Sequence, residues 1–401
     1  MADTAAGERG AGFARFTFRL RVSRFADRAL GAEWGRCRWV WNQCVAASRA
    51  AQQAGEACGP ATLDRRLTSW RAEHAWLRDG GSVPQQQTIR DFAASRAKAL
   101  KDIKAKVPVI RRAGMPRFKR KDRAALTLNY TRRGFRLKRG RLHLAGGIEL
   151  GVVWSRPLPA EPSSVRVYRD RLGHWYASFV VPAQTEPLPK TGRALGIDWG
   201  VRELATTTSD AHDLPHPEHG TSAAAKLARY QRMMARRKPA KGQGASKGYQ
   251  RARRQAAKVH ARTARRRQDT VRSWAKRVVA DHDAIAVEDF RPKFLAKSTL
   301  ARKSADAAIA TAKRELITAA RKHGCRIHLV DPAYTTMDCA RCGARAKHTL
   351  PLSERTYTCT ACGLVSPRDK NSARVMLVRA GLYPAGDDRG RPGRPPDAQA
   401  A

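Results

Sequence analysis

Alternating apolar and basic side chains open the interpretable part of the chain. From 15 to 22 every second residue is apolar and the residues between are mostly arginines. That period predicts a strand with one buried face and one basic face. Between 30 and 45, and again between 89 and 103, apolar residues recur with helical spacing, so we expect a small helical unit over 27–105.

Beyond 107 the pattern returns to short β-prone runs separated by turn residues. These runs predict six further strands. They lie at 126–130, 135–137, 142–144, 150–154, 164–168 and 175–181. Together with the first strand they suggest a barrel into which the helical unit is inserted, with a linker over 182–189.

The second half places acids at the ends of short apolar segments. The run 194–208 predicts a hairpin whose first strand delivers Asp198, and 284–289 predicts a strand that ends in Glu288 and Asp289. Asp369 precedes the helix-like segment 372–377. We also expect a helix over 301–323 and a strand over 326–330.

Three carboxylates brought together would repel each other, by about 4 kcal/mol per ionised pair at about 4 Å and an effective dielectric near 20. A divalent cation relieves that repulsion, so a cluster of Asp198, Glu288 and Asp369 would favour a metal site. Taken alone, Asp198 is equally compatible with an aspartate that merely begins a turn.

The charge balance limits the classes of binding partner that the chain can have. The chain has 79 Lys and Arg against 34 Asp and Glu, a formal net charge of +45. Such an excess calls for a polyanion, and nucleic acid is the favoured one. An anionic membrane is disfavoured because no run approaches 18 consecutive apolar residues, and no signal-peptide pattern opens the chain. We therefore expect a cytoplasmic protein.

The strongest concentration of charge lies between 226 and 277, where 19 Lys or Arg accompany a single acid, Asp269. Apolar residues keep helical spacing there, and a break over 239–248 divides two helices. A solvated charged face is the alternative, but such a face usually mixes both signs. A helical hairpin that binds phosphates is the better interpretation.

The eight cysteines divide into two groups. Cys37, Cys44, Cys58 and Cys325 are scattered and are expected to be reduced packing residues. The others form the pattern C-x2-C-x16-C-x2-C, with a glycine directly after each pair. That group is Cys339, Cys342, Cys359 and Cys362. It predicts a closed structural zinc site, with a redox pair as the weaker alternative.

Read in order, these segments resemble the TnpB (OrfB) family of transposon-encoded RNA-guided nucleases, which are relatives of the type V CRISPR effectors. The resemblance rests on five segments. They are 196–200 with 204–206, then 287–289, then 331–336, then the segment that carries the four clustered cysteines (the zinc ribbon), and finally 368–373. It covers roughly 13 to 380.

The resemblance implies a multidomain protein of α/β and α+β class. An OB-like wedge β-barrel (first strand within 1–26, remainder with a linker over 106–189) would hold an inserted helical recognition unit over 27–105. An RNase H-like (RuvC) nuclease domain over 190–335 and 366–382 would be interrupted by the zinc ribbon at 336–365. A disordered tail would occupy 383–401.

The same resemblance implies an endonuclease that cleaves target double-stranded DNA beside a short adjacent motif. Asp198, Glu288 and Asp369 would hold two Mg²⁺ ions (Mn²⁺ as a substitute) for phosphodiester hydrolysis, with Zn²⁺ purely structural. A guide RNA from the transposon end would select the DNA, so the protein would be found with the prokaryotic nucleoid when bound. The oligomeric state stays open.

Several alternatives remain. The segment 366–369 lacks the acid that relatives commonly place two residues before Asp369, although Asp369 itself is present. The scaffold could act as an RNA-guided repressor that binds without cutting, or as a transposase that joins strands. A ribosome-like RNA-binding protein is a weaker alternative because it leaves the ordered acids unexplained.

Overall fold

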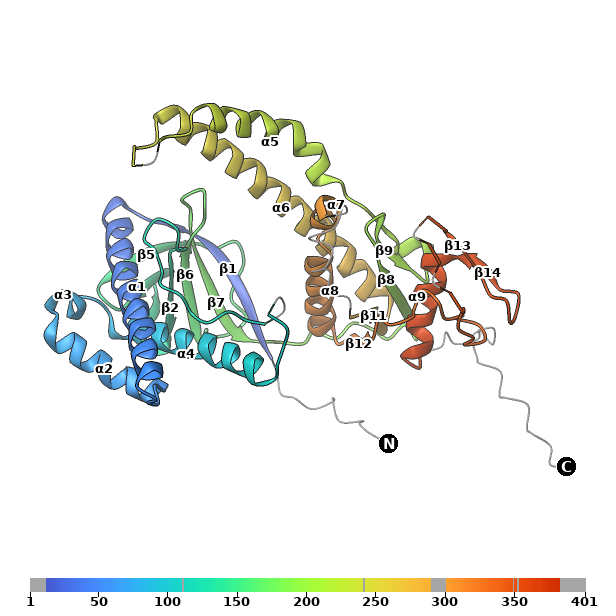
Figure 1. Ribbon diagram of the computed structural model, residues 1–401, viewed down its shortest axis with the longest axis horizontal. Helices are drawn as coiled ribbons and strands as arrows, with labels where there is room; N and C mark the ends of the chain where they lie inside the picture. Colours follow the sequence, from blue (N-terminus) through green and yellow to red (C-terminus); the bar gives the residue numbers. More distant parts are fainter. Residues whose placement is uncertain are drawn as a thin grey trace. The chain divides into compact units, whose positions relative to one another are not determined.

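The structure is a computed structural model that describes residues 12–109, 112–240, 242–289, 301–348, 350–351 and 353–382. The expected disordered tail at 383–401, and nearly all of the expected disordered start, lie outside the described residues. The chain divides into two compact units (Figure 1), and the boundary falls between Gln184 and Thr185.

The described part of the amino-terminal unit contains a seven-stranded antiparallel sheet in the order β2-β6-β7-β1-β5-β4-β3. Its strands are β1 (Phe13–Arg21), β2 (Thr127–Thr131), β3 (Phe135–Lys138), β4 (Arg141–Leu144), β5 (Ile148–Val153), β6 (Ser164–Arg169) and β7 (Trp175–Pro182). Each lies where the alternation predicts a strand.

The sheet curls around one core without closing. Its edge strands β2 and β3 are joined by a short 3-10 helix, η1 (Arg132–Gly134), and within the described residues no ladder pairs them. Tyr130 of β2 and Phe135 of β3 nevertheless share a buried cluster with Phe18 of β1. The predicted barrel is therefore present as a near-barrel. Helix α4 (Ser82–Lys104) covers the open side, where a Cβ at Gly134 would lie 2.7 Å from Val83.

Between β1 and β2 the chain forms helices α1 (Arg24–Gln53), α2 (Pro60–Glu73), α3 (Ala75–Arg78) and α4. Ser23 begins α1, because its hydroxyl accepts the Ala26 N–H at 3.1 Å. The first turns of α1 pack on the sheet through Leu30, and the later turns pack on α2 and α4. Cys37, Cys44 and Cys58 are buried in these clusters, as expected of packing residues.

In the carboxy-terminal unit the described residues form a five-stranded sheet in the order β10-β9-β8-β11-β12. Its strands are β8 (Ala194–Trp199), β9 (Glu203–Thr207), β10 (Leu214–Pro215), β11 (Ala284–Glu288) and β12 (Arg326–Val330). β8 and β9 form the predicted antiparallel hairpin, whereas β11 lies parallel to both β8 and β12.

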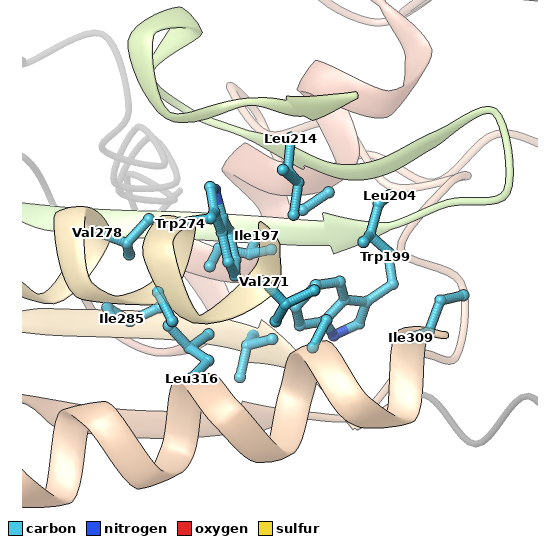
Figure 2. Packing of buried hydrophobic residues seen from close by; sticks show 14 of the residues in the cluster. Ile197, Trp199, Leu204, Leu214, Val271, Trp274, Val278, Ile285, Ile309 and Leu316 are labelled. Carbon is cyan, nitrogen blue, oxygen red and sulfur yellow. The ribbon is translucent and has the colours of Figure 1, made fainter. Parts of the chain in front are cut away.

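Helices cover both faces of this sheet. The described helices of this unit are α5 (His219–Arg236), α6 (Lys247–Asp281), α7 (Ala301–Ala307), α8 (Ile309–His323) and α9 (Arg368–Arg379). Of these, α5 has no buried residue and packs along α6. Figure 2 shows one face, where Trp274 and Val278 of α6 and Leu316 of α8 pack on Ile197 and Ile285. On the other face α9 packs against β11 and β12.

The single helix expected over 301–323 is two helices. Ala308 has the left-handed φ of +56° and separates α7 from α8. A short hairpin of β13 (Thr356–Thr358) and β14 (Val365–Pro367) lies between β12 and α9 and carries the second cysteine pair. None of the described helices combines the length and apolar character needed to span a bilayer.

Candidate functional site: three acids beside a four-cysteine cluster

The register of β8 and β11 brings two of the predicted acids to the same edge of the sheet. The parallel pairing aligns Gly196 with Ala286 and Ile197 with Val287. Asp198 and Glu288 follow directly, each near the carboxyl end of its strand. Adjacent parallel strands therefore present both carboxylates at one edge.

The alternation of side chains places both acids on the same face. Ile197 and Val287 point into the core with α6 and α8, while Ala286 packs against α9 on the opposite face. Because successive strand residues alternate in direction, Asp198 and Glu288 share the face that α9 covers. Glu288 is buried, with 7% of its surface exposed, and Asp198 is partly buried.

Gly196 explains how α9 comes so close. A Cβ added at this position would lie 2.0 Å from the carbonyl oxygen of Ala373 and 3.0 Å from Cγ of Leu377. Only glycine lets the helix backbone rest directly on β8. The first turn of α9, which carries Asp369, is thereby held beside the acid-bearing edge.

The pKa values of Asp198 and Glu288 are both raised. Burial raises the pKa of Asp198 well above its usual value, and the negative charges of Glu288 and Asp369 raise it further against the opposing charge of Arg368. Burial also raises the pKa of Glu288 to about 7, although the Trp199 backbone N–H and Lys313 act in the opposite direction. The negative charges of Glu288 and Asp369 therefore oppose the ionisation of Asp198.

The three carboxylates do not converge on one point as a finished metal site does. Among the described residues, the four cysteines alone form a group of metal-ligating side chains that could hold an ion as placed. Asp369 instead lies 3.7 Å from a guanidinium nitrogen of Arg355, which reaches it from the ribbon. Lys313 of α8 pairs with Asp289, the neighbour of Glu288.

The cysteine cluster is built from two similar turns. In each, the first cysteine accepts at its carbonyl the N–H of the glycine that follows the pair, at 3.0 Å for Gly343 and 2.9 Å for Gly363. Both glycines have left-handed φ, +74° and +71°. The sulfur atoms of Cys339, Cys342, Cys359 and Cys362 all lie within 4.8 Å of one another. This set suits a tetrahedral structural zinc ion.

The sequence did not identify several residues that surround Asp369. Arg368 binds the ribbon through its N–H to the Arg355 carbonyl at 2.8 Å and its side chain to the Pro351 carbonyl at 2.9 Å. Lys370 donates to the Thr207 carbonyl at 2.9 Å and to Asp213 at 2.7 Å. These residues stand in the segment 368–373 that carries the family resemblance, but only the tertiary structure gives them partners.

A second candidate surface is the basic hairpin of α5 and α6. α5 has no buried residue among those described, and most of its charge is exposed. The exposed cations of the two helices are Lys226, Arg229, Arg232, Arg236, Lys247, Arg251, Arg253, Arg254, Lys258, Arg262, Arg265, Arg266, Arg272, Lys276 and Arg277. Such a one-sided array is suited to phosphate contacts.

Two acids fix the base of this hairpin. Asp306 of α7 accepts the Gly220 N–H at 2.7 Å, the Thr221 N–H at 3.0 Å and the Arg267 guanidinium at 2.9 Å. Burial alone would raise the pKa of Asp306, but these bonds hold it below its usual value. Glu315 of α8 likewise pairs with Arg272. The base of the hairpin is therefore anchored to α7 and α8.

The amino-terminal unit carries its own cationic cavity of about 540 Å³, next to η1. Its lining residues are Arg132, Arg133, Phe135, Arg136, Leu137, Glu161 and Pro162. Arg132 is ion-paired with Glu161. The guanidinium groups of this cavity can accept a phosphate.

Comparisons with known proteins place these features in a family. The model of the OrfB_IS605 family, described as "Probable transposase", matches 178–299, and that of the Cas12f1-like TNB domain matches 311–376. A protein of Streptomyces pristinaespiralis named "Putative RNA-guided DNA endonuclease" is 35% identical over 323 residues, covering 79% of this chain and 76% of the relative.

Two further relatives extend the comparison. "Putative RNA-guided DNA endonuclease InsQ" of Escherichia coli K12 is 28% identical over 407 residues, covering 95% of both chains. Among solved structures, a chain of the Cas12f1–sgRNA–target DNA complex matches with a TM-score of 0.54 at 14% identity, over 88% of this chain and 82% of that one. At such low identity the likeness concerns the fold alone. The sequence match to the Streptomyces protein is close and long enough to decide the family, and this chain belongs to the OrfB (TnpB) family.

Proposed function

We propose that this chain is a transposon-encoded, RNA-guided endonuclease that cleaves target double-stranded DNA beside a short adjacent motif. The observation that carries the proposal is the placement of Asp198 and Glu288 at the ends of adjacent parallel strands, on the face that α9 covers. Asp369 lies in the first turn of that helix. The names of two relatives support the same reaction.

Asp198, Glu288 and Asp369 would hold two Mg²⁺ ions, with Mn²⁺ as a substitute. The donors are all carboxylate oxygens, which hard cations prefer, and Asp198 is destabilised by the neighbouring charges that a cation would neutralise. Such ions supply a nucleophilic water at neutral pH and stabilise the charge of the leaving oxygen. We assign the unit to the RNase H-like (RuvC) class on this arrangement.

The chain's own groups orient these acids. The Trp199 N–H is hydrogen-bonded to the Glu288 carboxylate and, with the charge of Lys313, favours its ionised form. Lys370 fastens the first turn of α9 to the loop after β9. Arg355 places a guanidinium beside Asp369, where it can contact a phosphate bound at the acids.

The four cysteines would bind one Zn²⁺ as a structural ion. All four positions of a tetrahedral site are filled by sulfur, so none is open to substrate. On the order of 10 kcal/mol from metal binding would stabilise a segment whose hydrophobic cluster is small.

The expected partners are a guide RNA from the transposon end and the target DNA that it pairs with. Strand exchange between a DNA duplex and an RNA–DNA hybrid is nearly balanced, so contacts from protein to backbone help to decide it. The basic hairpin and the cationic cavity offer such contacts in the two units. Contacts to about ten phosphates would weaken binding about 10⁵-fold between roughly 50 and 200 mM salt.

The direct test incubates guide-bound protein with matching duplex and Mg²⁺, beside Asp198→Ala and the exposed-acid control Asp269→Ala. We expect Asp198→Ala to bind the duplex normally and to cleave it at least about 10³-fold more slowly, because several kcal/mol of charge stabilisation are lost. Sequencing the co-purified RNA should reveal one discrete species with a variable end. Normal target selection by RNA-free protein would contradict the proposal.

A second candidate function is guided binding without cleavage. "CRISPR-associated DNA-binding protein Cas12m" of Allomeiothermus silvanus is 29% identical over 124 residues, covering 29% of this chain and 23% of the relative. All three acids are present here, which favours cutting. Target binding without cleavage by the unaltered protein would favour the repressor, and joined recombinant strands would favour a transposase.

A further inference from the structure

A fully buried amide connects the cysteine cluster to the helix that carries Asp369. Asn371 lies in the first turn of α9 and has 0% of its surface exposed. Its Nδ2 donates to the Asp338 carbonyl at 2.8 Å, and its Oδ1 accepts the Ala340 N–H at 3.1 Å. Asp338 and Ala340 are the two residues on either side of Cys339.

These bonds are selective for the backbone conformation that a bound zinc ion would fix. Cys339 is a predicted zinc ligand; its N–H already donates to the Ala344 carbonyl, and its carbonyl already accepts the Gly343 N–H. The Asn371 amide is hydrogen-bonded to the peptide groups directly before and after Cys339. A shift of the turn would break both bonds and leave buried polar groups unpaired, which is costly.

Asp338 is fixed on its other side as well. Its carboxylate pairs with Arg379, in the last turn of α9, at 2.6 Å. It also pairs with Arg345, in the ribbon, at 2.7 Å. α9 therefore holds the first cysteine turn at two points, one near each end of the helix. The opposite side of α9 rests on Gly196 of β8. The cysteine turn, α9 and the acid-bearing strand form one continuous set of contacts.

We propose that Asn371 is a positioning residue, through which zinc bound at the four cysteines holds the Asp369 carboxylate in place for a divalent cation. This inference rests on the proposed function, because it takes Asp369 as a cation ligand. Asp369 is only two residues from Asn371, within the same helical turn. Groups that orient metal ligands from behind typically change metal affinity 10- to 100-fold.

The test compares Asn371→Leu with Ser372→Ala in the full chain. Tb³⁺ is titrated into RNA-free protein, because RNA phosphates also bind hard cations, and cleavage is measured with the guide RNA bound. Ser372 is equally buried in α9, but among the described residues its hydroxyl donates only to the Arg368 carbonyl within the helix. The probe is Tb³⁺, a hard cation that carboxylates bind and that thiolates do not favour. Trp199, next to Asp198, can sensitise its luminescence. Zinc content, guide RNA affinity and the Mg²⁺ dependence of cleavage are measured on the same samples.

We expect Asn371→Leu to retain zinc and guide RNA, to bind Tb³⁺ about tenfold more weakly and to need about tenfold more Mg²⁺ for cleavage. Ser372→Ala should match the unaltered protein. Unchanged Tb³⁺ affinity in zinc-loaded Asn371→Leu overturns the proposal. If this variant loses zinc because it misfolds, the smaller change Asn371→Ser is used with the same criteria.

Zinc removal provides a second readout. A thiophilic chelator should weaken Tb³⁺ binding in the unaltered protein, and much less in the Asn371 variant, because the connection is already broken. Equal weakening in both overturns the proposal. Asp369→Asn separates the two hypotheses. If it weakens Tb³⁺ binding while the unaltered protein cuts no DNA, the proposed function fails and the positioning role stands. If Asp369→Asn binds Tb³⁺ as tightly as the unaltered protein does, the positioning role fails.

Discussion

The four cysteines and the three acids of the carboxy-terminal unit are brought together in different ways. The four sulfurs already lie within 4.8 Å of one another, and each pair is set by a local turn that closes on its own glycine. The acids come from β8, β11 and α9, and two of them have pKa values raised by burial. A thiolate cluster can therefore be built by short-range geometry, whereas the carboxylate cluster depends on tertiary contacts throughout the unit.

The largest expected effect is at the local cluster. Cys359→Ser should abolish zinc binding by the ribbon, which forfeits on the order of 10 kcal/mol of metal-linked folding energy. Zinc content should fall from about one ion per chain to none, and the ribbon should become sensitive to protease. The matched control is Cys325→Ser, outside the cluster, which should keep its zinc. Retention of zinc by Cys359→Ser would contradict the assignment of the four cysteines as one zinc site.

The next largest effect is expected from a substitution that displaces the three acids but leaves the four cysteines in place. Gly196→Ala forces a methyl group into the Ala373 carbonyl, so α9 must move from β8, at a cost of about 3 kcal/mol. The denaturation midpoint should fall and cleavage should be lost, while zinc content stays at its normal value. Gly31→Ala is the control, since nothing lies within 4 Å of a Cβ there and the helix should gain up to about 1 kcal/mol.

This difference also explains what could be predicted from the sequence. The strand alternation at 15–22 and the cysteine spacing are short-range signals, and the structure forms β1 and the four-sulfur group there. Asp198 and Glu288 were expected at strand ends, and they share one face and one edge. Their role as cation ligands stays a prediction.

The failures have long-range causes. The alanine-rich run 301–323 has an unbroken helical period, so nothing local reveals the left-handed Ala308 that splits it. The predicted barrel is present as a near-barrel, because η1 joins the two edge strands and no ladder pairs them among the described residues. Asn371 and Lys370 acquire their roles only from partners more than 30 residues away.

A smaller effect should sharpen the distinction. Lys370→Met removes the side chain that ties the first turn of α9 to the Thr207 carbonyl and to Asp213, and should cost about 1–3 kcal/mol because these groups are partly buried. Denaturant titration measures this cost, and zinc content should not change. Lys322→Met breaks only an exposed pair with Glu186 and should shift stability by less than about 1 kcal/mol. Equal shifts in the two variants would contradict the anchoring role.

The smallest effect on stability is expected at Arg355, where the two clusters meet. Its ion pair with Asp369 is long and largely exposed, so Arg355→Ala should change the free energy of unfolding by less than about 1 kcal/mol. Cleavage should nevertheless fall about tenfold or more, because a charge-assisted contact to the bound phosphate is lost. Arg341→Ala removes another exposed ribbon arginine and should leave the single-turnover rate unchanged. If both variants cut equally fast, the ribbon contributes to the acid cluster only by holding α9 in place.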